Sequence, residues 1–145
     1  MKHDLILKFR EFNRYYTKVI GLTNNHILDS KYSLSEVRVM YEIYHTPNIT
    51  ARKIKEIIQV DEGYLSRLIK KLVNQNLIIK TKSKKDNRVS SLKLSENGVK
   101  VFLELNDRSS RAMENVVKHL NENEQNELIL MLEKIKNLLG KDGFK

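Results

Sequence analysis

The sequence predicts a mainly α-helical protein with a small β-hairpin, an α+β fold in a single domain of residues 1–145. Residues 49–94 combine two short helical patterns, a tight turn and a basic segment of strand composition, and long amphipathic patterns lie on both sides. One proline and five glycines leave few positions that break a helix. The content of 40% hydrophobic and 31% charged residues is typical of a globular domain with a modest core.

The central segment opens with a short helix. Thr50 is expected to be its N-cap, because threonine's side-chain oxygen can accept a hydrogen bond from a free N–H of the first turn. Gln59 and Val60 then form the turn, and Asp61 caps the next helix. The apolar residues of the first helix recur on one face at helical spacing: Ala51, Ile54, Ile57 and Ile58.

The second short helix has two contrasting faces. A stripe at i, i+3, i+4 and i+7 is expected to be buried: Leu65, Leu68, Ile69 and Leu72. The opposite face is small near its start and basic further along: Glu62, Gly63, Ser66, Arg67, Lys70, Lys71 and Asn74. A helix that enters the major groove of DNA needs short groups where the backbone comes close and hydrogen-bond donors beyond them.

A hairpin follows directly. Residues 77–82 and 89–94 have strand composition, and the loop 83–88 contains Asp86-Asn87, which favours a turn. A helix-turn-helix followed by a charged hairpin is a winged helix, which we place at residues 34–98. Eleven basic and four acidic residues lie between Thr50 and Ser90, giving +7 of the chain's +9. This concentration of charge predicts a nucleic-acid partner for the winged helix.

Long helices are expected before this segment. An amphipathic pattern covers residues 3–28, and its stripe either packs on its own domain or forms a subunit interface. A polar break at 24–33 precedes a helix at 34–45, capped by Ser33 or Ser35 and ended by Pro47. That helix is apolar on nearly all sides, so we expect it to be buried.

Two further helices complete the chain. Ser95 is the expected N-cap of a helix that runs to about His119. Asn121 and Glu124 have the spacing of a capping box for a last helix, which Gly140 ends. The terminal stripes exceed what one small domain can bury, so a two-fold homodimer through residues 1–28 and 99–140 is expected.

Five motifs in this order resemble the MarR family of winged-helix regulators: Leu34-Ser35-Glu36, Val60-Asp61 with Leu65-Ser66-Arg67-Leu68, Asn76-Leu77-Ile78, Asp86-Asn87-Arg88 and Leu94-Ser95-Glu96-Asn97-Gly98. The resemblance covers nearly the whole chain. It implies an obligate dimer on a pseudo-palindromic operator of double-stranded DNA, usually a repressor that a small ligand releases. It also implies that Arg88 enters the minor groove and that Asp86 steadies it. Asn76 stands where the family usually has glycine, and asparagine also suits a left-handed cap.

The charge pattern and the resemblance together predict the DNA-binding residues Thr50, Arg52, Gly63, Tyr64, Ser66, Arg67, Lys70, Lys71, Lys84, Lys85, Asp86 and Arg88. Tyr64 either bonds a phosphate or packs on the wing. A second hypothesis concerns a pocket for a small effector between the first two helices, lined by Tyr15, Tyr16, Met40 and Tyr44. Aromatic residues at helical spacing are more often part of a core, which is the interpretation we favour for these four.

Two other functions compete with a specific regulator. Residues 12–17, 20–21 and 62–67 are similar to the MarR module that precedes a GNAT acetyltransferase domain, for which this chain has no room, so a regulatory module of such a system is one alternative. The other is a basic protein that coats nucleic acid without sequence preference.

Other classes of function find no support in the sequence. It contains no glycine-rich phosphate loop and no nucleophile beside a credible base, so we expect no enzyme. It has no cysteine, and its four histidines are scattered, so we expect neither a metal site nor a cofactor. No apolar run approaches the roughly 20 residues of a membrane span, and the N-terminus lacks a signal-peptide core, so we expect a cytoplasmic protein.

Overall fold

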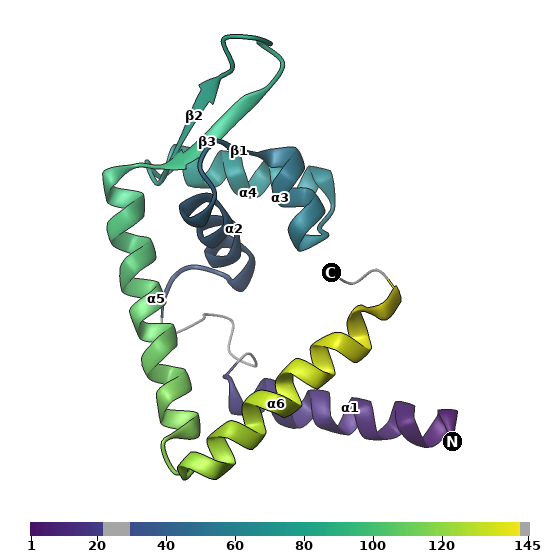
Figure 1. The fold of residues 1–145 in the computed structure, drawn as a ribbon. Helices are drawn as coiled ribbons and strands as arrows, with labels where there is room; N and C mark the ends of the chain where they lie inside the picture. The colour runs from purple at the N-terminus through teal and green to yellow at the C-terminus, as the bar shows by residue number, and fades with distance from the viewer. Residues whose placement is uncertain (22–29, 143–145) are drawn as a thin grey trace.

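The computed structural model describes residues 1–21 and 30–142 and confirms a mainly helical fold with a small wing (Figure 1). The helices are α1 (Lys2–Val19), α2 (Leu34–His45), α3 (Ala51–Ile58), α4 (Glu62–Asn74), α5 (Glu96–Val117) and α6 (Glu122–Leu139), followed by the 3-10 turn η2 (Gly140–Asp142). The strands are β1 (Ile49–Thr50), β2 (Ile78–Lys82) and β3 (Ser90–Leu94), which form one antiparallel sheet in the order β1-β3-β2.

The hydrophobic core lies inside the winged helix. Met40 of α2, Ile54 of α3 and Leu72 of α4 are completely buried, and Phe102 attaches the first turns of α5 to the same cluster. The predicted stripe of α4 is buried along its whole length. This core fixes α3, α4 and the hairpin relative to one another, which is what a DNA-reading surface requires.

Side-chain caps begin the helices of the winged helix where the sequence predicts them. Thr50 accepts a hydrogen bond from the N–H of Lys53 at 3.2 Å, and Asp61 accepts one from the N–H of Tyr64 at 3.0 Å. Of the two candidates for α2, Ser33 is the cap, in a reciprocal capping box with Glu36. The predicted caps Ser95 and Asn121 are also present. The confirmed caps place every helix start after α1 to within a residue.

Strand β1 is the element that sequence patterning misses. It has only two residues, too short for an alternating pattern, and Ile49 pairs with Leu92 of β3. Asn48, with φ of 57°, turns the chain into it. The pairing places the N-terminus of α3 beside the wing.

The end of α4, the wing and the start of α5 meet at one tight junction. Asn76 adopts φ of 58°, the left-handed conformation expected of it, and its carbonyl accepts a hydrogen bond from Ser95 Oγ at 2.5 Å. The Leu77 carbonyl accepts one from the N–H of Ser95 at 3.0 Å. A Cβ placed on Gly98 would lie only 2.0 Å from that Leu77 oxygen. Only glycine therefore lets α5 approach the backbone this closely.

Two expectations about the N-terminal half are wrong in part. Helix α1 ends at Val19 rather than near Leu28, and Gly21 has φ of 75°, which a right-handed helix does not accommodate. The remainder of that prediction, together with most of the polar break, falls on residues 22–29, outside the described residues. Helix α2 has the predicted bounds but is not buried on all sides, because Tyr41 and Tyr44 are exposed. Its buried residues also include two that are charged, Glu36 and Glu42.

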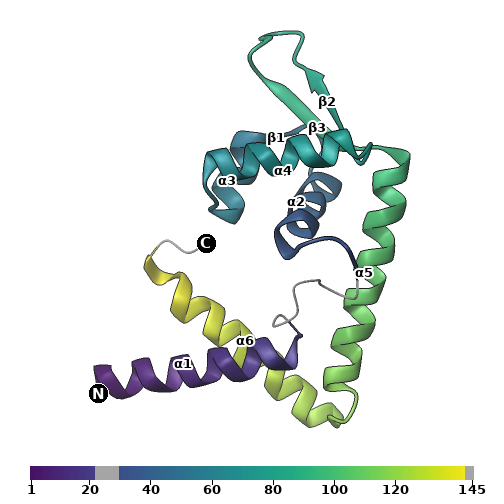
Figure 2. The same cartoon turned by 180° about the vertical axis from the view of Figure 1, so that it is seen from behind.

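The terminal helices extend away from the winged helix. Helix α5 runs from the wing to the opposite end of the molecule, where α6 turns back and α1 lies (Figures 1 and 2). Neither α1 nor α6 has a buried residue, and large apolar side chains such as Leu5 and Leu130 are 67% and 71% exposed. Within the described residues, no helix has the length and apolar content to cross a membrane.

We expect Gly98→Ala to lower the free energy of unfolding by roughly 2–3 kcal/mol, toward the upper end of what overpacking costs, because the new Cβ meets backbone. Urea unfolding followed by circular dichroism measures this. Gly140→Ala is the matched control, since its Cβ would enter open space at φ of −81°. The control should be neutral or stabilising by up to about 1 kcal/mol. Equal effects of the two changes would disprove the close approach of α5.

Candidate nucleic-acid interface

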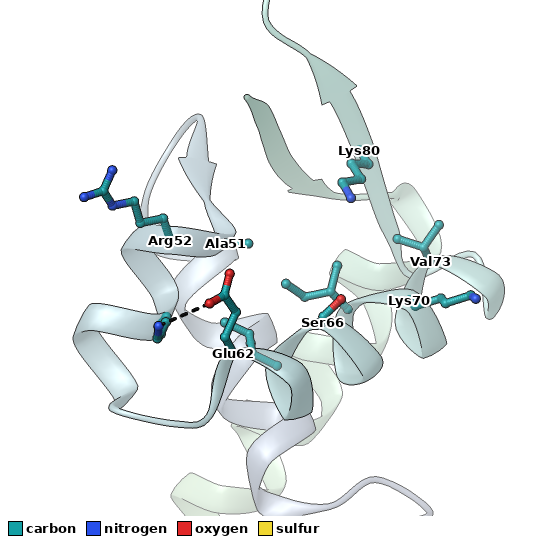
Figure 3. Close-up of a pocket in the computed structure, with 10 residues that line it drawn as sticks. Ala51, Arg52, Glu62, Ser66, Lys70, Val73 and Lys80 are labelled. Atoms are coloured by element: carbon teal, nitrogen blue, oxygen red, sulfur yellow. Dashed lines mark hydrogen bonds and ion pairs between the residues drawn. The ribbon is translucent and has the colours of Figure 1, made fainter. Parts of the chain in front are cut away.

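A groove of about 530 Å³ lies between α3, α4 and β2 (Figure 3). Its apolar floor is formed by Leu65, Ile69 and Val73 of α4. In Figure 3, Ser66 faces the groove from α4 and Lys80 reaches toward it from β2. The helix caps and the core hold all three walls, so the groove is a fixed feature of the winged helix.

The rim of this groove is basic. Glu62 is the only acidic residue that lines it. The other charged residues of the lining are four cations: Arg52, Lys55, Lys70 and Lys80. Glu62 lies with its Oε2 3.5 Å from Lys55 Nζ, an exposed pair that ties α3 to α4. One acidic group against four basic groups leaves the groove positively charged, which suits a polyanion.

A second hollow of about 310 Å³ adjoins the groove on the wing side. The two share Ala51, Arg52 and Lys80 in their linings, and the second adds Thr50 and Arg88. We call the surface formed by both hollows the basic strip. It runs without interruption from α4 to the wing, a shape that follows an extended backbone of phosphates.

The wing turn is held by hydrogen bonds that main-chain N–H groups donate. The carboxylate of Asp86 accepts a hydrogen bond from the backbone N–H of Arg88 at 2.9 Å, and its carbonyl accepts one from the N–H of Val89 at 3.0 Å. The N–H of Ser83 donates to the Val89 carbonyl at 2.7 Å, which closes the loop. Asp86 therefore fixes the position of Arg88 through its backbone, by a hydrogen bond that a neutral acceptor could also make.

The predicted DNA-binding residues fall into four places. Thr50, Arg52, Ser66, Lys70 and Arg88 line the basic strip. The exposed side of α4 holds Gly63, Tyr64 and Arg67, and the wing tip holds Lys84, Lys85 and Asp86. Lys71 stands apart from these, because its ammonium pairs with Glu36 of α2 at 2.5 Å.

The structure adds Lys55 and Lys80 to the basic strip, neither of which sequence reasoning selected. A usable signal existed for Lys55, which lies three residues after Arg52 and so on the same side of a helix. Lys80 could not be assigned a direction, because the two faces of a short polar strand are indistinguishable until the sheet is packed.

On α4, Arg67 lies close to Gly63. A Cβ on Gly63 would lie 3.5 Å from Nη1 of Arg67 and 3.2 Å from a carboxylate oxygen of Asp61. The guanidinium of Arg67 thus folds back over the first turn of the helix. The contact of a Cβ with Arg67 would be an ordinary one, so the tighter approach at this position is the one to the capping Asp61.

The residues of the predicted effector pocket are not brought together in the single chain. Met40 is completely buried, as its assignment to the core requires, whereas Tyr15, Tyr16 and Tyr44 are 64%, 43% and 43% exposed. The core interpretation is therefore wrong for the three tyrosines within one chain. Tyr44 instead lies against Phe102, with ring centroids 4.6 Å apart.

The sequence pattern of the MarR family matches residues 32–90, which comprise α2, both helices of the helix-turn-helix, β2 and the wing loop up to the first residue of β3. Over this segment the chain is similar to the MarR family, whose named relatives are winged helix-turn-helix transcriptional regulators. All residues that line the basic strip except Leu92 lie within the matched segment.

Three relatives illustrate the similarity. The HTH-type transcriptional regulator BilQ of Clostridium symbiosum is 28% identical over 89 residues, which are 61% of this chain and 62% of BilQ. A mutant of E. coli MarR complexed with operator DNA superimposes with a TM-score of 0.74 at 20% identity, over 93% of this chain and 97% of that one. Bordetella bronchiseptica BpsR, whose DNA binding is regulated by 6-hydroxynicotinic acid, gives 0.71 at 16% identity, over 90% and 98%.

We expect Asp86→Ala to raise the hydrogen-exchange rate of the Arg88 amide by about two- to tenfold, the net worth of one hydrogen bond. Asp86→Asn should leave the rate nearly unchanged, because the amide oxygen can accept the same hydrogen bond. Exchange measured by NMR at fixed pH, with the Thr81 amide of β2 as reference, tests both. If the asparagine variant exchanges as fast as the alanine variant, the charge of Asp86 is what matters.

Proposed function

We propose that this protein binds a specific double-stranded operator as a homodimer and represses transcription until a small ligand releases it. The basic strip is the observation that carries the proposal: it joins the helix-turn-helix to the wing in one positive surface. A helix and a wing that share such a surface can contact the major groove and the adjacent minor groove together.

Helix α4 is the proposed recognition helix. Residues advance by about 100° each around an α-helix, so Gly63, Arg67 and Asn74 lie opposite the buried stripe. Arg67 is the proposed base-reading residue, since arginine can donate two hydrogen bonds to guanine. Ser66 and Lys70 face the strip and lie within reach of the same groove edge. Tyr64, which is 39% exposed, is proposed to bond a phosphate.

The wing and α3 are proposed to contact the backbone and the minor groove. Arg88 follows the turn that Asp86 holds, and arginine is attracted to narrow A·T-rich minor grooves. Lys84 and Lys85 at the wing tip, with Thr50 and Arg52 at the start of α3, are proposed to bind phosphates. Phosphate contacts position the protein and carry no sequence information, so these residues set affinity and register.

The exposed terminal helices support a dimer. Helix α6 presents a row of apolar side chains that its own chain leaves uncovered: Ile129, Leu130, Met131, Leu132, Ile135, Leu138 and Leu139. Leu5, Phe9 and Phe12 do the same on α1. A two-fold axis through these helices would present two copies of α4 to the half-sites of a pseudo-palindrome, about one helical turn apart.

A relative and three exposed tyrosines support release by a small ligand. DNA binding by BpsR, which shares this fold, is regulated by 6-hydroxynicotinic acid. In this chain, Tyr15, Tyr16 and Tyr44 have exposed rings from which a second subunit could complete a pocket. BilQ is a transcriptional regulator and the MarR mutant is complexed with operator DNA, so neither relative supports an acetyltransferase module.

Arg67→Ala should reduce the preference for operator over random duplex by about 1–3 kcal/mol, while the affinity for random duplex stays nearly intact. Lys84→Ala should weaken binding to operator and random duplex together, because one phosphate contact is lost. The salt slope, which is the slope of log affinity against log salt concentration, should fall by about one per subunit. Affinities for both duplexes across a salt series measure these effects. An operator can first be selected from a random DNA library.

The same measurements separate specific binding from coating. A wild-type protein that binds operator and random duplex equally at fixed salt would refute a specific regulator and favour non-specific binding. Equal losses on both duplexes for Arg67→Ala would instead make Arg67 a phosphate contact. The specificity would then come from Tyr64, Ser66 or Lys70, or from the shape of the DNA.

Sedimentation at micromolar concentration should give twice the 17.1 kDa of one chain. The reason is the apolar surface of α1 and α6, which a second copy is expected to cover. The sedimentation coefficient should not fall on dilution through the micromolar range. A species of 17.1 kDa would show that the terminal helices serve another purpose.

A further inference from the structure

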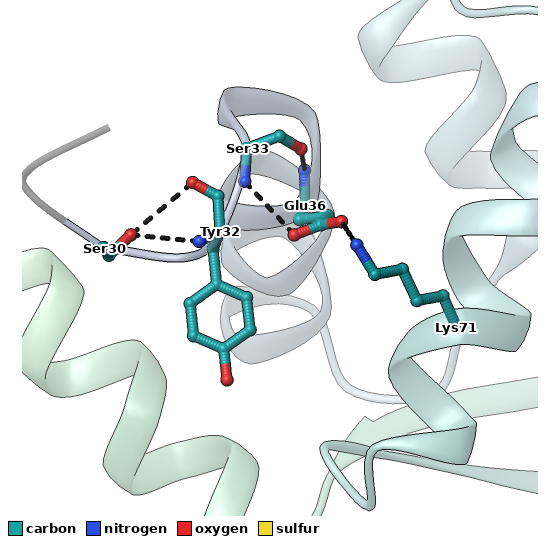
Figure 4. A network of polar contacts seen from close by, with 5 residues as sticks. All are labelled: Ser30, Tyr32, Ser33, Glu36 and Lys71. Atoms are coloured by element: carbon teal, nitrogen blue, oxygen red, sulfur yellow. Dashed lines mark hydrogen bonds and ion pairs between the residues drawn. The ribbon is translucent and has the colours of Figure 1, made fainter. Parts of the chain in front are cut away.

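Lys71 differs from its basic neighbour in the direction that it takes. Residues advance by about 100° each around an α-helix, so Lys70 and Lys71 lie on different flanks of α4. Lys70 lines the groove of the basic strip. Lys71 reaches the other way, and its Nζ lies 2.5 Å from Oε1 of Glu36 at the start of α2 (Figure 4).

Glu36 is a buried carboxylate with both oxygens in use. The residue is only 3% exposed. Its Oε2 accepts a hydrogen bond from the N–H of Ser33 at 3.1 Å, which is one half of the capping box of α2, and its Oε1 accepts the hydrogen bond from Lys71. A buried charge is stable only when it is paired and hydrogen-bonded, so Lys71 provides the counter-charge that the buried Glu36 carboxylate requires.

The pair also reaches the segment that enters α2. Tyr32 is 8% exposed and belongs to the hydrophobic core, and its N–H donates to Ser30 Oγ at 3.2 Å. Ser33 follows directly and shares the capping box with Glu36. Lys71 therefore connects the proposed recognition helix to a fixed turn that is 35 residues away in the sequence.

We propose that Lys71 is a positioning residue, whose ion pair with Glu36 holds α4 at the angle at which its outer face reads DNA, and that it binds no phosphate. This inference rests on the proposed function, and it replaces the DNA contact that the sequence predicts for Lys71. The hydrogen bond that Lys71 donates to Glu36, followed by the negative charge of Glu36, raises the pKa of Lys71. Side chains on a reading helix must be held to within about 0.5 Å and 10–20° to act, which makes such a support consequential.

The test compares Lys71→Met, Glu36→Gln and the double variant for operator affinity across a salt series. Each single change should weaken operator binding by about the same factor, three- to tenfold. The double variant should bind the operator no more weakly than the single variant with the lower affinity. The salt slope should equal that of the wild type in all three. Lys70→Met is the matched control one residue away, and it should lower the slope by about one per subunit. Lys71→Arg should retain operator affinity, since it can keep the pair.

Unfolding in urea shows whether the pair itself exists, without DNA. Lys71→Met should lower the midpoint more than Glu36→Gln, because it strands a buried carboxylate, whereas the lysine side chain left behind by Glu36→Gln is 53% exposed. Adding Glu36→Gln to Lys71→Met should raise the midpoint again. Independent, additive changes in midpoint would overturn the pair.

The outcomes distinguish this inference from the function on which it rests. A lowered salt slope for Lys71→Met, with operator affinity intact for Glu36→Gln, would make Lys71 a phosphate contact and overturn the inference alone. A wild-type protein without preference for any selected operator, but with coupled midpoints for the two residues, would overturn the proposed function while the pair stands as a structural contact.

Discussion

The close approach of α5 to the Leu77 carbonyl governs the arrangement of the winged helix. Three backbone directions change within a few residues there: α4 ends, β2 begins, and β3 passes into α5. The left-handed backbone of Asn76, the two hydrogen bonds of Ser95 and the missing side chain of Gly98 make these changes compatible. The groove of the basic strip has α4 as one wall and β2 as another, so its width is set at this junction.

Helix α4 is constrained on three sides, and each constraint has a different physical origin. Its apolar stripe is removed from water in the core. Its groove side faces α3 and β2 across charged groups, with only the exposed Lys55–Glu62 pair as a direct ionic link. Its third side meets the buried carboxylate of Glu36. What remains free is the outer face with Arg67, which is the face that a DNA-reading helix needs to expose.

The winged helix and the terminal helices differ in how far a single chain buries their apolar residues. The winged helix has a closed core with Val39, Met40 and Ile54 fully buried. Helices α1 and α6 contribute no buried residue, although large apolar side chains recur along both. An amphipathic helix without a partner exposes its apolar face to water, as α1 and α6 do in the single chain.

The sequence alone determined the features that depend on local chemistry. The caps Thr50, Asp61, Ser95 and Asn121, the left-handed Asn76 and the buried stripe of α4 follow from residue type and spacing, because the interactions involved span only a few residues. The MarR resemblance and the location of the positive charge were also readable at this level. The length of α1 was not, since an apolar pattern does not reveal where a helix stops being supported.

Tertiary structure decided the features that join distant residues. The partner of Lys71 lies 35 positions away and was invisible to any local pattern, as was the pairing of Ile49 with Leu92. Whether Tyr44 is buried, and on which side Lys80 lies, depends on how helices and strands pack, since a periodicity defines a face but not what covers it. The sequence therefore specified α4 and its positive charge, and tertiary packing decided that Lys71 pairs with Glu36 while Lys70 lines the groove.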